Sequence, residues 1–426
     1  MALLDRRAGF EEPVLSAGAA RRTAEVFGQP LSASESVRRI LAEVRSRGDD
    51  AVREFARKFD GATLGEIEVP RERWAEALRS LPSGLEDALR VAASRIRAYA
   101  EASMPKGWRD DDAGFGEAIA AIERVGLYVP GGTAAYPSTV LMAGIPARVA
   151  GVREIVLCTP MPNAVTLAAA YVAGVDRVFG IGGAQAIGAM AYGTANVPKV
   201  DKICGPGNIF VSIAKREVYG SVDIDGMYGP TETVVIADDS PDPALAAADL
   251  LAQAEHDEMA SPVLITTSRA MAEKVIAAGK EQVARLERAA IAGASMERNA
   301  VAVVVRTVEE AVELANAFAP EHLCLLVDEP WRYVPLVRNA GGVFVGEHSP
   351  EVMGDYVAGP SHVMPTSGTA RFASALSVHA FIKHVPVVAL SGDTMRRLGP
   401  SASAIARAEG LTAHARAVEL RLEGGR

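Results

Sequence analysis

The sequence predicts an α/β fold in which short strands alternate with helices along most of the chain. From Val125 onward, short runs rich in β-branched residues are separated by amphipathic or alanine-rich segments of helical length. Strands that alternate with such helices are typical of βαβ units, whose strands pair in parallel. The chain has 426 residues, of which 49% are hydrophobic, so it can bury at least two cores. We therefore expect two parallel-sheet domains with additional terminal extensions.

The first part of the chain is predicted to be an extension followed by helices. Residues 1–30 show weak periodicity and are expected to form the N-terminal extension. Ser34 can cap a helix whose apolar residues recur at steps of three and four and which ends at Gly48. A second short helix is expected to end at the Asp60-Gly61 turn, and further helical segments occupy 72–103.

A first set of alternating elements covers residues 125–233 and predicts one complete α/β domain. Its strands are expected at 125–129, 154–158, 177–181 and 200–203, and its helices near 138–150, 163–173 and 184–193. Asn163 is suited to cap the middle helix, and Gly174 is suited to end it.

A second set of strands is expected at 263–266, 300–305, 323–327 and 342–345. We predict that it belongs to a discontinuous α/β domain made of 31–124 and 234–376. The remaining residues, 377–426, are expected to form a C-terminal extension with helices at 404–409 and 418–422 that docks on another subunit. The predicted fold class is thus two Rossmann-like parallel-sheet domains with helical N- and C-terminal extensions.

Charge and cysteine content exclude several classes of protein. The formal net charge is −9 and no block of Lys or Arg occurs, which argues against nucleic acid and against an anionic membrane as partners. Cys158, Cys204 and Cys324 are far apart, form no CxxC pair and lie in or beside apolar runs, so reduced, buried thiols in a cytoplasmic protein are expected. The N-terminus does not resemble a signal peptide, and no apolar stretch is long enough to span a membrane. A small-molecule ligand is therefore expected.

Three glycine-rich turns follow predicted strand ends in the first α/β domain: Pro130-Gly131-Gly132, Gly180 to Gln185, and Gly205-Pro206-Gly207-Asn208. In open parallel sheets, ligands bind beyond the carboxyl ends of the strands, where backbone N–H groups and helix N-termini can hold phosphates. None of the turns matches GxGxxG, and each could simply be a tight turn. Together they favour a nucleotide-like ligand.

Four residues in three places have side chains that can ligate a metal: Gln253, His256, Asp355 and His414. Gln253 and His256 would leave one face of a helix, and two imidazoles with oxygen donors suit Zn²⁺. Each residue taken singly is more often ordinary hydrogen-bonded structure. Sequence spacing cannot establish that the distant ones meet.

Glu321 and His322 form an adjacent carboxylate and imidazole just before a predicted strand. Such a pair can supply two proton-transfer groups, although an isolated dipeptide of this kind is more often a solvated loop. Glu409 and His414 would not share a helical face, but Gly410 can turn the chain between them.

Eight motifs, spread in order over residues 125–414, together resemble the histidinol dehydrogenase family. They are Val-Gly-Leu-Tyr128-Val-Pro-Gly-Gly, Ile-Gly-Gly-Ala-Gln185-Ala-Ile, Cys-Gly-Pro-Gly-Asn208, Ile-Asp-Gly-Met-Tyr-Gly-Pro-Thr231-Glu, Gln253-Ala-Glu-His256, Pro-Glu321-His322-Leu, Gly-Asp355-Tyr and Glu409-Gly-Leu-Thr-Ala-His414. Such broad coverage is far more specific than any single motif.

The resemblance implies oxidation of L-histidinol through L-histidinal to L-histidine, the last steps of histidine biosynthesis, with two NAD⁺ consumed. His322 would take the hydroxyl proton and Glu321 would activate water for the second oxidation. The resemblance also implies a homodimer in which the C-terminal extension reaches the partner's active site. It implies these site residues: one Zn²⁺ per subunit on Gln253, His256, Asp355 and His414; substrate contacts from these ligands and from Thr231, His322 and Glu409; and NAD contacts from Tyr128, Gln185 and Asn208.

Three positions depart from the family's commonest pattern, namely Tyr228 in place of a small residue, Thr231 in place of Ser, and Ser361 in place of Asn before His362. Thr231 keeps the hydroxyl, whereas Tyr228 adds bulk near the expected substrate wall. One alternative is a paralogous dehydrogenase of another alcohol such as a sulfonated diol, although the acidic Glu409 favours a substrate that is cationic or bears N–H groups. A second alternative is a non-catalytic metal- or nucleotide-binding protein, which would not need the Glu321–His322 pair.

Overall fold

The structure is a computed structural model that describes residues 15–131 and 135–424. Gly132 of the first glycine-rich turn and the first fourteen residues of the expected N-terminal extension lie outside this part of the chain. The chain divides into two compact units, unit 1 (Met1–Ser103 and Ile122–Phe381) and unit 2 (Met104–Ala121 and Ile382–Arg426). The predicted α/β class with two parallel sheets is confirmed. Among the described helices, none has the length and apolarity needed to cross a membrane.

The first sheet of unit 1 has five parallel strands in the order β5-β4-β3-β6-β7. The strands are β3 (Arg124–Tyr128), β4 (Glu154–Cys158), β5 (Arg177–Phe179), β6 (Lys202–Cys204) and β7 (Asp223–Ile224). The interior strands β3 and β4 are continuous apolar runs, because both faces of the sheet are covered by helices. The strand order reverses between β3 and β6, which makes this point the topological switch of the sheet.

The helices of the first sheet follow the expected alternation. They are α6 (Pro137–Val149), α7 (Ala164–Ala173), α8 (Gly183–Tyr192) and α9 (Ile209–Val218). As predicted, the Asn163 side chain accepts a hydrogen bond from the Thr166 N–H at 2.9 Å, and Gly174 ends α7 with φ of 73°.

The helices before the first sheet pack mainly on the helices that cover that sheet. They are α1 (Ala17–Phe27), α2 (Ala33–Arg47), α3 (Asp49–Phe55), a π-helical turn (Ala56–Asp60), α4 (Arg71–Arg79) and α5 (Leu85–Ser103). Apolar residues of α2 and α3, such as Val37 and Phe55, share one core with Tyr128 and Ile187 of the first sheet layer. This packing differs from the expected grouping of residues 31–124 with the second sheet, while the exact domain boundaries remain a prediction.

The predicted cap of α2 is wrong. Ser32, rather than Ser34, accepts from the Glu35 N–H, and the Glu35 carboxylate accepts in return from the Ser32 N–H at 3.0 Å. This capping box satisfies two free N–H groups at once, so the helix begins before Ser34, which is buried within it.

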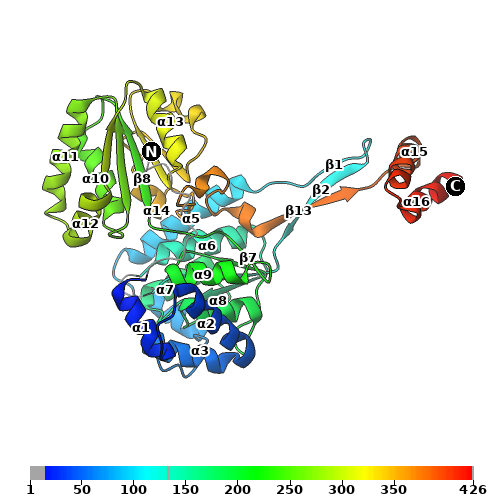
Figure 1. Ribbon diagram of the computed structural model, residues 1–426, viewed down its shortest axis with the longest axis horizontal. Coiled ribbons are helices and arrows are strands. Elements are labelled where there is room, and N and C mark those ends of the chain that lie inside the picture. The colour runs from blue at the N-terminus through cyan, green and yellow to red at the C-terminus, as the bar shows by residue number, and fades with distance from the viewer. Residues whose placement is uncertain (1–14, 132–134, 425–426) are drawn as a thin grey trace. The chain divides into compact units, whose positions relative to one another are not determined.

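The second sheet of unit 1 is also parallel, in the order β10-β9-β8-β11-β12. Its strands are β8 (Glu232–Ala237), β9 (Ser261–Thr266), β10 (Val301–Val304), β11 (His322–Leu326) and β12 (Gly342–Val345). Helices α10 (Pro243–Ala254), α11 (Arg269–Val283) and α12 (Ala289–Asn299) lie on one side and α13 (Val308–Phe318) on the other (Figure 1). The sequence analysis did not include β8, although it is the central strand and is buried throughout.

The segment after β12 contains the short helix α14 (Glu351–Tyr356) and two 3₁₀ turns, Thr369–Arg371 and Val378–Phe381. Two further 3₁₀ turns, Pro330–Arg332 and Val334–Leu336, lie between β11 and β12.

Unit 2 combines a small antiparallel sheet with two helices. The sheet has the order β1-β2-β13 and consists of β1 (Trp108–Asp110), β2 (Phe115–Ala121) and β13 (Ile382–Val388). The helices α15 (Gly392–Ala408) and α16 (Thr412–Glu423) are joined through Gly410, whose φ is 77°. The expected turn at Gly410 is confirmed, whereas β13 within the C-terminal extension was not expected.

Candidate active site

The candidate catalytic residues of unit 1 gather at the amino ends of the two strands where the second sheet reverses its order. Thr231 immediately precedes β8, Glu321 immediately precedes β11, and His322 is the first residue of β11. β8 and β11 are neighbours, with His322 opposite Thr233. Two segments that are ninety residues apart in the chain are therefore adjacent in the fold.

Thr231 links Gln253 to Glu321. Its Oγ1 lies 2.6 Å from Gln253 Oε1 and 2.7 Å from Glu321 Oε2. A hydroxyl has one hydrogen, so one of the two contacts needs a hydrogen from the other partner, either a protonated Glu321 or a rotated Gln253 amide. Burial raises the pKa of Glu321 to about 7, although His322 and the Thr231 hydroxyl act against this rise. Glu321 can therefore gain or lose a proton near neutral pH.

His322 is buried among carboxyl groups. Its Nδ1 lies 3.3 Å from the Glu232 carbonyl oxygen and 3.7 Å from Glu321 Oε2, and its Nε2 lies 3.5 Å from Asp355 Oδ1. Its ring stacks on Phe344 with the centroids 5.7 Å apart. Burial alone would lower the pKa of His322, but the negative charges of Glu321 and Asp355 raise it to about 10. In return, despite its own burial, Asp355 has its pKa held below the usual range by His322.

Glu351 is a fully buried carboxyl that the sequence analysis did not single out. Its Oε2 accepts a hydrogen bond from the Thr233 hydroxyl at 2.7 Å, and its Oε1 has no hydrogen-bond partner among the described residues. Burial raises the pKa of Glu351 to about 7, and the charge of His322 opposes that rise. Nothing around Glu351 in the sequence distinguishes it from a surface glutamate at the start of a helix.

The predicted ligand residues of unit 1 come from two helix ends. Gln253 lies buried in the last turn of α10, whereas His256 lies in the turn after that helix, with an exposed side chain. The prediction that both residues project from one helical face is therefore wrong in detail, because α10 ends at Ala254. Asp355 lies in α14.

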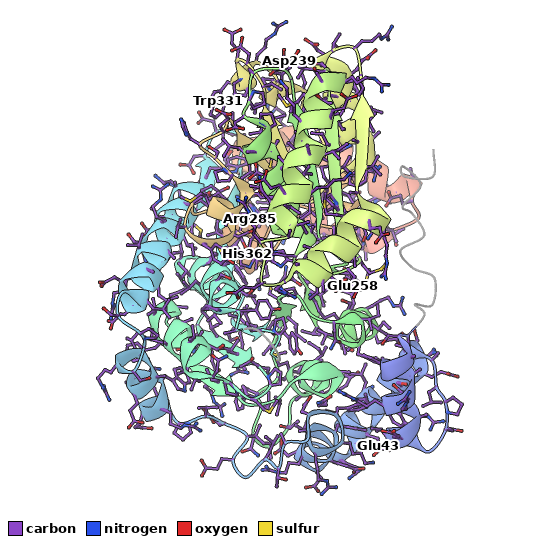
Figure 2. The ribbon with its side chains drawn as sticks, turned by 90° about the vertical axis from the view of Figure 1, so that its left-hand side faces the viewer. Glu43, Asp239, Glu258, Arg285, Trp331 and His362 are labelled. Carbon is purple, nitrogen blue, oxygen red and sulfur yellow. The ribbon has the colours of Figure 1, made fainter. Side chains whose placement is uncertain are left out.

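His362 was noted in the sequence without a role, and the structure brings it to the same site. Its Nδ1 lies 2.8 Å from the Asp355 carbonyl oxygen, and its Nε2 lies 3.3 Å from the hydroxyl oxygen of Thr139 in α6. Figure 2 shows His362 with its surrounding side chains. The only signal in the sequence was its separation of seven residues from Asp355, across a glycine-containing loop.

Glu409 and His414 belong to unit 2. Both side chains are exposed, one at the end of α15 and the other in the first turn of α16. Unit 1 thus brings together Thr231, Gln253, Glu321, His322 and Asp355 by contacts within it. Among the described residues, no three His, Cys, Asp or Glu side chains form a group that could hold a metal ion by themselves.

The residues predicted to contact NAD lie at the carboxyl ends of strands in the first sheet. The hydroxyl of Tyr128, the last residue of β3, accepts from the Gly183 N–H at 3.1 Å. Gln185 in α8 is 1% exposed, and its Nε2 has no partner within the described part of the chain. Asn208 caps α9 by accepting from the N–H groups of Phe210 and Val211 at 3.1 and 3.2 Å. Helix N-termini at this edge can accommodate phosphate groups.

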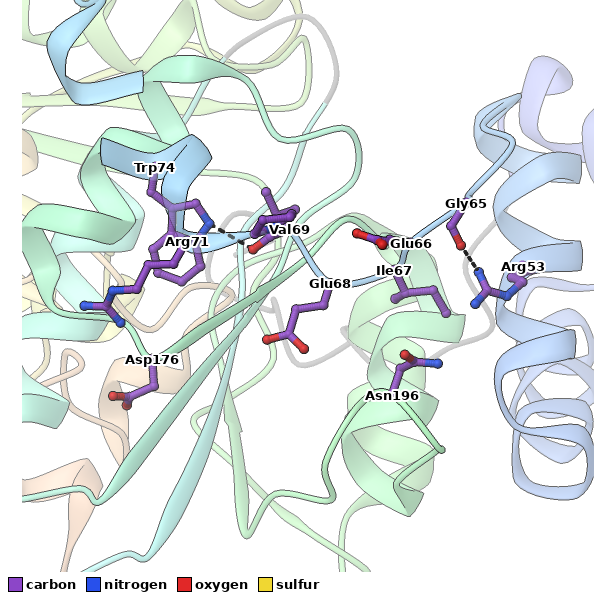
Figure 3. A pocket seen from close by; sticks show the side chains of 11 residues that line it. Arg53, Gly65, Glu66, Ile67, Glu68, Val69, Arg71, Trp74, Asp176 and Asn196 are labelled. Carbon is purple, nitrogen blue, oxygen red and sulfur yellow. Dashed lines mark hydrogen bonds between the residues drawn. The ribbon is translucent and has the colours of Figure 1, made fainter. Parts of the chain in front are cut away.

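A polar pocket of about 410 Å³ lies elsewhere in unit 1 (Figure 3). Arg53 there donates to the Gly65 carbonyl at 2.7 Å, and the Trp74 indole donates to the Val69 carbonyl at 3.1 Å. None of the candidate site residues lines this pocket. Its volume therefore does not identify it as the active site.

Known proteins resemble this chain over nearly its whole length. The histidinol dehydrogenase family profile matches residues 27–422. A histidinol dehydrogenase of Gluconobacter oxydans is 48% identical over 425 residues, covering 98% of each chain, and one of Thermus thermophilus is 50% identical over 390 residues, covering 91% of this chain and 94% of the relative. The crystal structure of a histidinol dehydrogenase from Elizabethkingia anophelis is similar with a TM-score of 0.90 and 33% identity, and the match covers 99% of this chain and 96% of that one. On this evidence, the chain belongs to the histidinol dehydrogenase family.

Proposed function

We propose that this chain oxidises L-histidinol to L-histidine through L-histidinal, with two NAD⁺ as oxidants. The observation that carries the proposal is the contact series Gln253–Thr231–Glu321–His322–Asp355 in a chain of this family. In this series, two groups that are suited to proton transfer lie next to residues that are suited to holding a metal and a substrate. A protein that only binds a metal or a nucleotide would have no use for such a proton-transfer pair.

We assign one Zn²⁺ per subunit to Gln253, His256, Asp355 and His414. The charges in unit 1 fit a cation, because His322 lies among three carboxyl groups, the buried Glu321 and Glu351 and the partly buried Asp355. Bound there, zinc would hold nitrogen atoms of the substrate and would act as a Lewis acid. Unit 1 provides three of the proposed ligands, and the exposed His414 imidazole is available as the fourth.

His322 and Glu321 would divide the proton transfers between them. His322 would remove the hydroxyl proton of histidinol as hydride leaves the carbinol carbon for NAD⁺. Glu321, with its pKa raised to about 7 by burial, would then remove a proton from the water that attacks histidinal. His322 must be neutral to act as a base. A cation bound at Asp355 would favour this neutral form, because it would counteract the carboxylate charge that raises the pKa of His322.

We propose that NAD binds at the switch point of the first sheet, against Tyr128, Gln185 and Asn208. The unpartnered Nε2 of Gln185 fits a ligand that supplies an acceptor, and the N-terminus of α9 behind Asn208 fits a phosphate. No cysteine is needed for either oxidation. Burial raises the pKa of Cys158, Cys204 and Cys324, which leaves all three thiols poor nucleophiles. These buried free thiols also support the expected cytoplasmic location.

We further propose a homodimer in which Glu409 and His414 of one subunit complete the partner's active site. In unit 2, Val385 and Val387 of β13 and Leu398 and Ile405 of α15 are more than 40% exposed. Aliphatic side chains in this number on a small unit favour burial in a subunit interface. The carboxylate of Glu409 is suited to an N–H-bearing substrate.

The decisive experiment is the NADH yield from limiting L-histidinol with excess NAD⁺, with and without a zinc chelator. Two NADH per histidinol, lost on chelation and restored by Zn²⁺, is the expected result. No turnover by folded, zinc-loaded protein would refute the proposal and would favour a paralogue acting on another alcohol, which the named relatives do not favour.

A further inference from the structure

A buried ion pair lies directly behind the turn that we assign to NAD. Lys215 in α9 and Asp225, which follows β7, form the pair, and their side chains are 2% and 1% exposed. Neither residue is among those to which the resemblance gives a role. A buried pair of opposite charges is costly to desolvate, so its presence calls for an explanation beyond stability.

Lys215 and Asp225 bind the backbone carbonyl and the backbone N–H of Gly205, the first residue of the turn. Lys215 Nζ donates to the Gly205 carbonyl oxygen at 2.9 Å, and the Gly205 N–H donates to Asp225 Oδ2 at 2.6 Å. Gly205 has φ of 115°, and a Cβ atom on it would lie 2.0 Å from the Tyr128 carbonyl oxygen. The ion pair therefore fixes a glycine whose conformation and close packing no other residue could adopt.

The same pair reaches the segment that leads into the candidate catalytic site. Residues 225–231 run from the carboxyl end of β7 in the first sheet to the amino end of β8 in the second. Lys215 Nζ lies 4.9 Å from the centre of the Tyr228 ring, within range of a cation–π contact. Further along the segment, the Gly229 N–H donates to the Thr366 hydroxyl oxygen at 2.7 Å, and Thr231 contacts Glu321.

We propose that Lys215 is a positioning residue. Together with Asp225 it holds the Gly205–Asn208 turn in the conformation that binds NAD. Through its contact with Tyr228 it aligns this turn with Thr231. The role rests on the proposed NAD site. It also gives Tyr228, which departs from the family's commonest pattern, a contact to Lys215 that a small side chain could not make.

The test compares NAD affinity with stability in matched variants. Lys215→Met removes the charge and keeps most of the packing. The double variant Lys215→Met/Asp225→Leu replaces the whole pair by apolar side chains, a change that is often neutral or stabilising. The control is Lys202→Met, because Lys202 is also mostly buried and pairs with Asp223 at 2.9 Å, but this pair does not contact Gly205.

The readouts are Kd for NADH from nucleotide fluorescence, KM for NAD⁺ and for L-histidinol, and Tm. We expect Kd for NADH to rise about tenfold in both Lys215 variants, because Gly205 loses the hydrogen bond from Lys215 in the single variant and also the one to Asp225 in the double variant. KM for NAD⁺ should rise more than KM for L-histidinol. The double variant should recover stability without recovering affinity, and the Lys202 control should keep the affinity of the wild type.

Two results would overturn the positioning role alone: unchanged NADH affinity in a folded double variant, or an equal loss of affinity in the Lys202 control. If Lys215→Met does not fold, the double variant still decides between these outcomes. Failure of the wild-type protein to bind NADH would instead overturn the NAD site, and the positioning role with it.

Discussion

Asp249 offers a direct test of the cost of the carboxyl groups buried behind the candidate site. It lies in α10, four residues before Gln253, and is 7% exposed. Burial raises the pKa of Asp249 from 3.8 to about 6. Because the folded state holds the proton more tightly than the unfolded state, ionisation of Asp249 destabilises the fold as pH rises. This loss of stability is absent at pH values below the pKa of Asp249 in the unfolded state and is complete at pH values above its pKa in the folded state.

The shift of about two pKa units corresponds to about 3 kcal/mol at pH 8, about half of that at pH 5 and about a fifth of it at pH 4. Asp249→Asn removes the charge at nearly constant volume, so the variant should be more stable than the wild type by up to this amount at pH 8. Unfolding in urea at pH 5 and pH 8 measures the difference. The control is Asp239→Asn, since Asp239 is exposed just after β8 (Figure 2). A variant no more stable than the wild type at pH 8, or a gain equal at both pH values, would refute the reasoning.

Three further predictions concern the proposed chemistry. His322→Asn should suppress both oxidations but retain zinc, because His322 is not a proposed ligand; loss of zinc, measured by metal analysis, would contradict its role as base. Glu321→Gln should slow the oxidation of histidinal more than that of histidinol, since only the second step needs activated water; single-turnover rates with each substrate measure this, and equal slowing would count against the role. Cys204→Ala should leave kcat within about threefold, because burial keeps the thiol from acting as a nucleophile; a loss of more than about a hundredfold would reveal covalent catalysis.

The parallel sheets were predictable because most of their strands stand out in the sequence as apolar runs, and the interior strands β3, β4, β9 and β11 are almost entirely buried. β4 and β12 were predicted with their observed bounds. The strands of unit 2 lack this signal. In β13, all residues except Ile382 are exposed, and the strand includes Lys383, His384 and Pro386, so neither an apolar run nor a regular alternation is present.

The site was predictable only where motifs carry it. Spacing could not reveal that Thr231 meets Glu321, because the pairing of β8 with β11 brings them together. Glu351 and His362 were missed as parts of the site for a similar reason. Each is defined by what it contacts after folding, namely Thr233 for Glu351, and Thr139 with the Asp355 backbone for His362.

The two proposed ligand sites lie at opposite edges of their sheets, and helix direction explains which ligand charge suits each edge. In the first sheet, α8 and α9 begin at the carboxyl ends of the strands, so their partial positive charges face the turns assigned to NAD phosphates. In the second sheet, α10 runs back from the carboxyl edge and ends at the amino edge, where Gln253 lies in its last turn. A helix C-terminus carries partial negative charge and favours a cation. The proposed anion and cation sites therefore lie at helix ends of matching polarity, and the segment held by Lys215 and Asp225 connects the two edges.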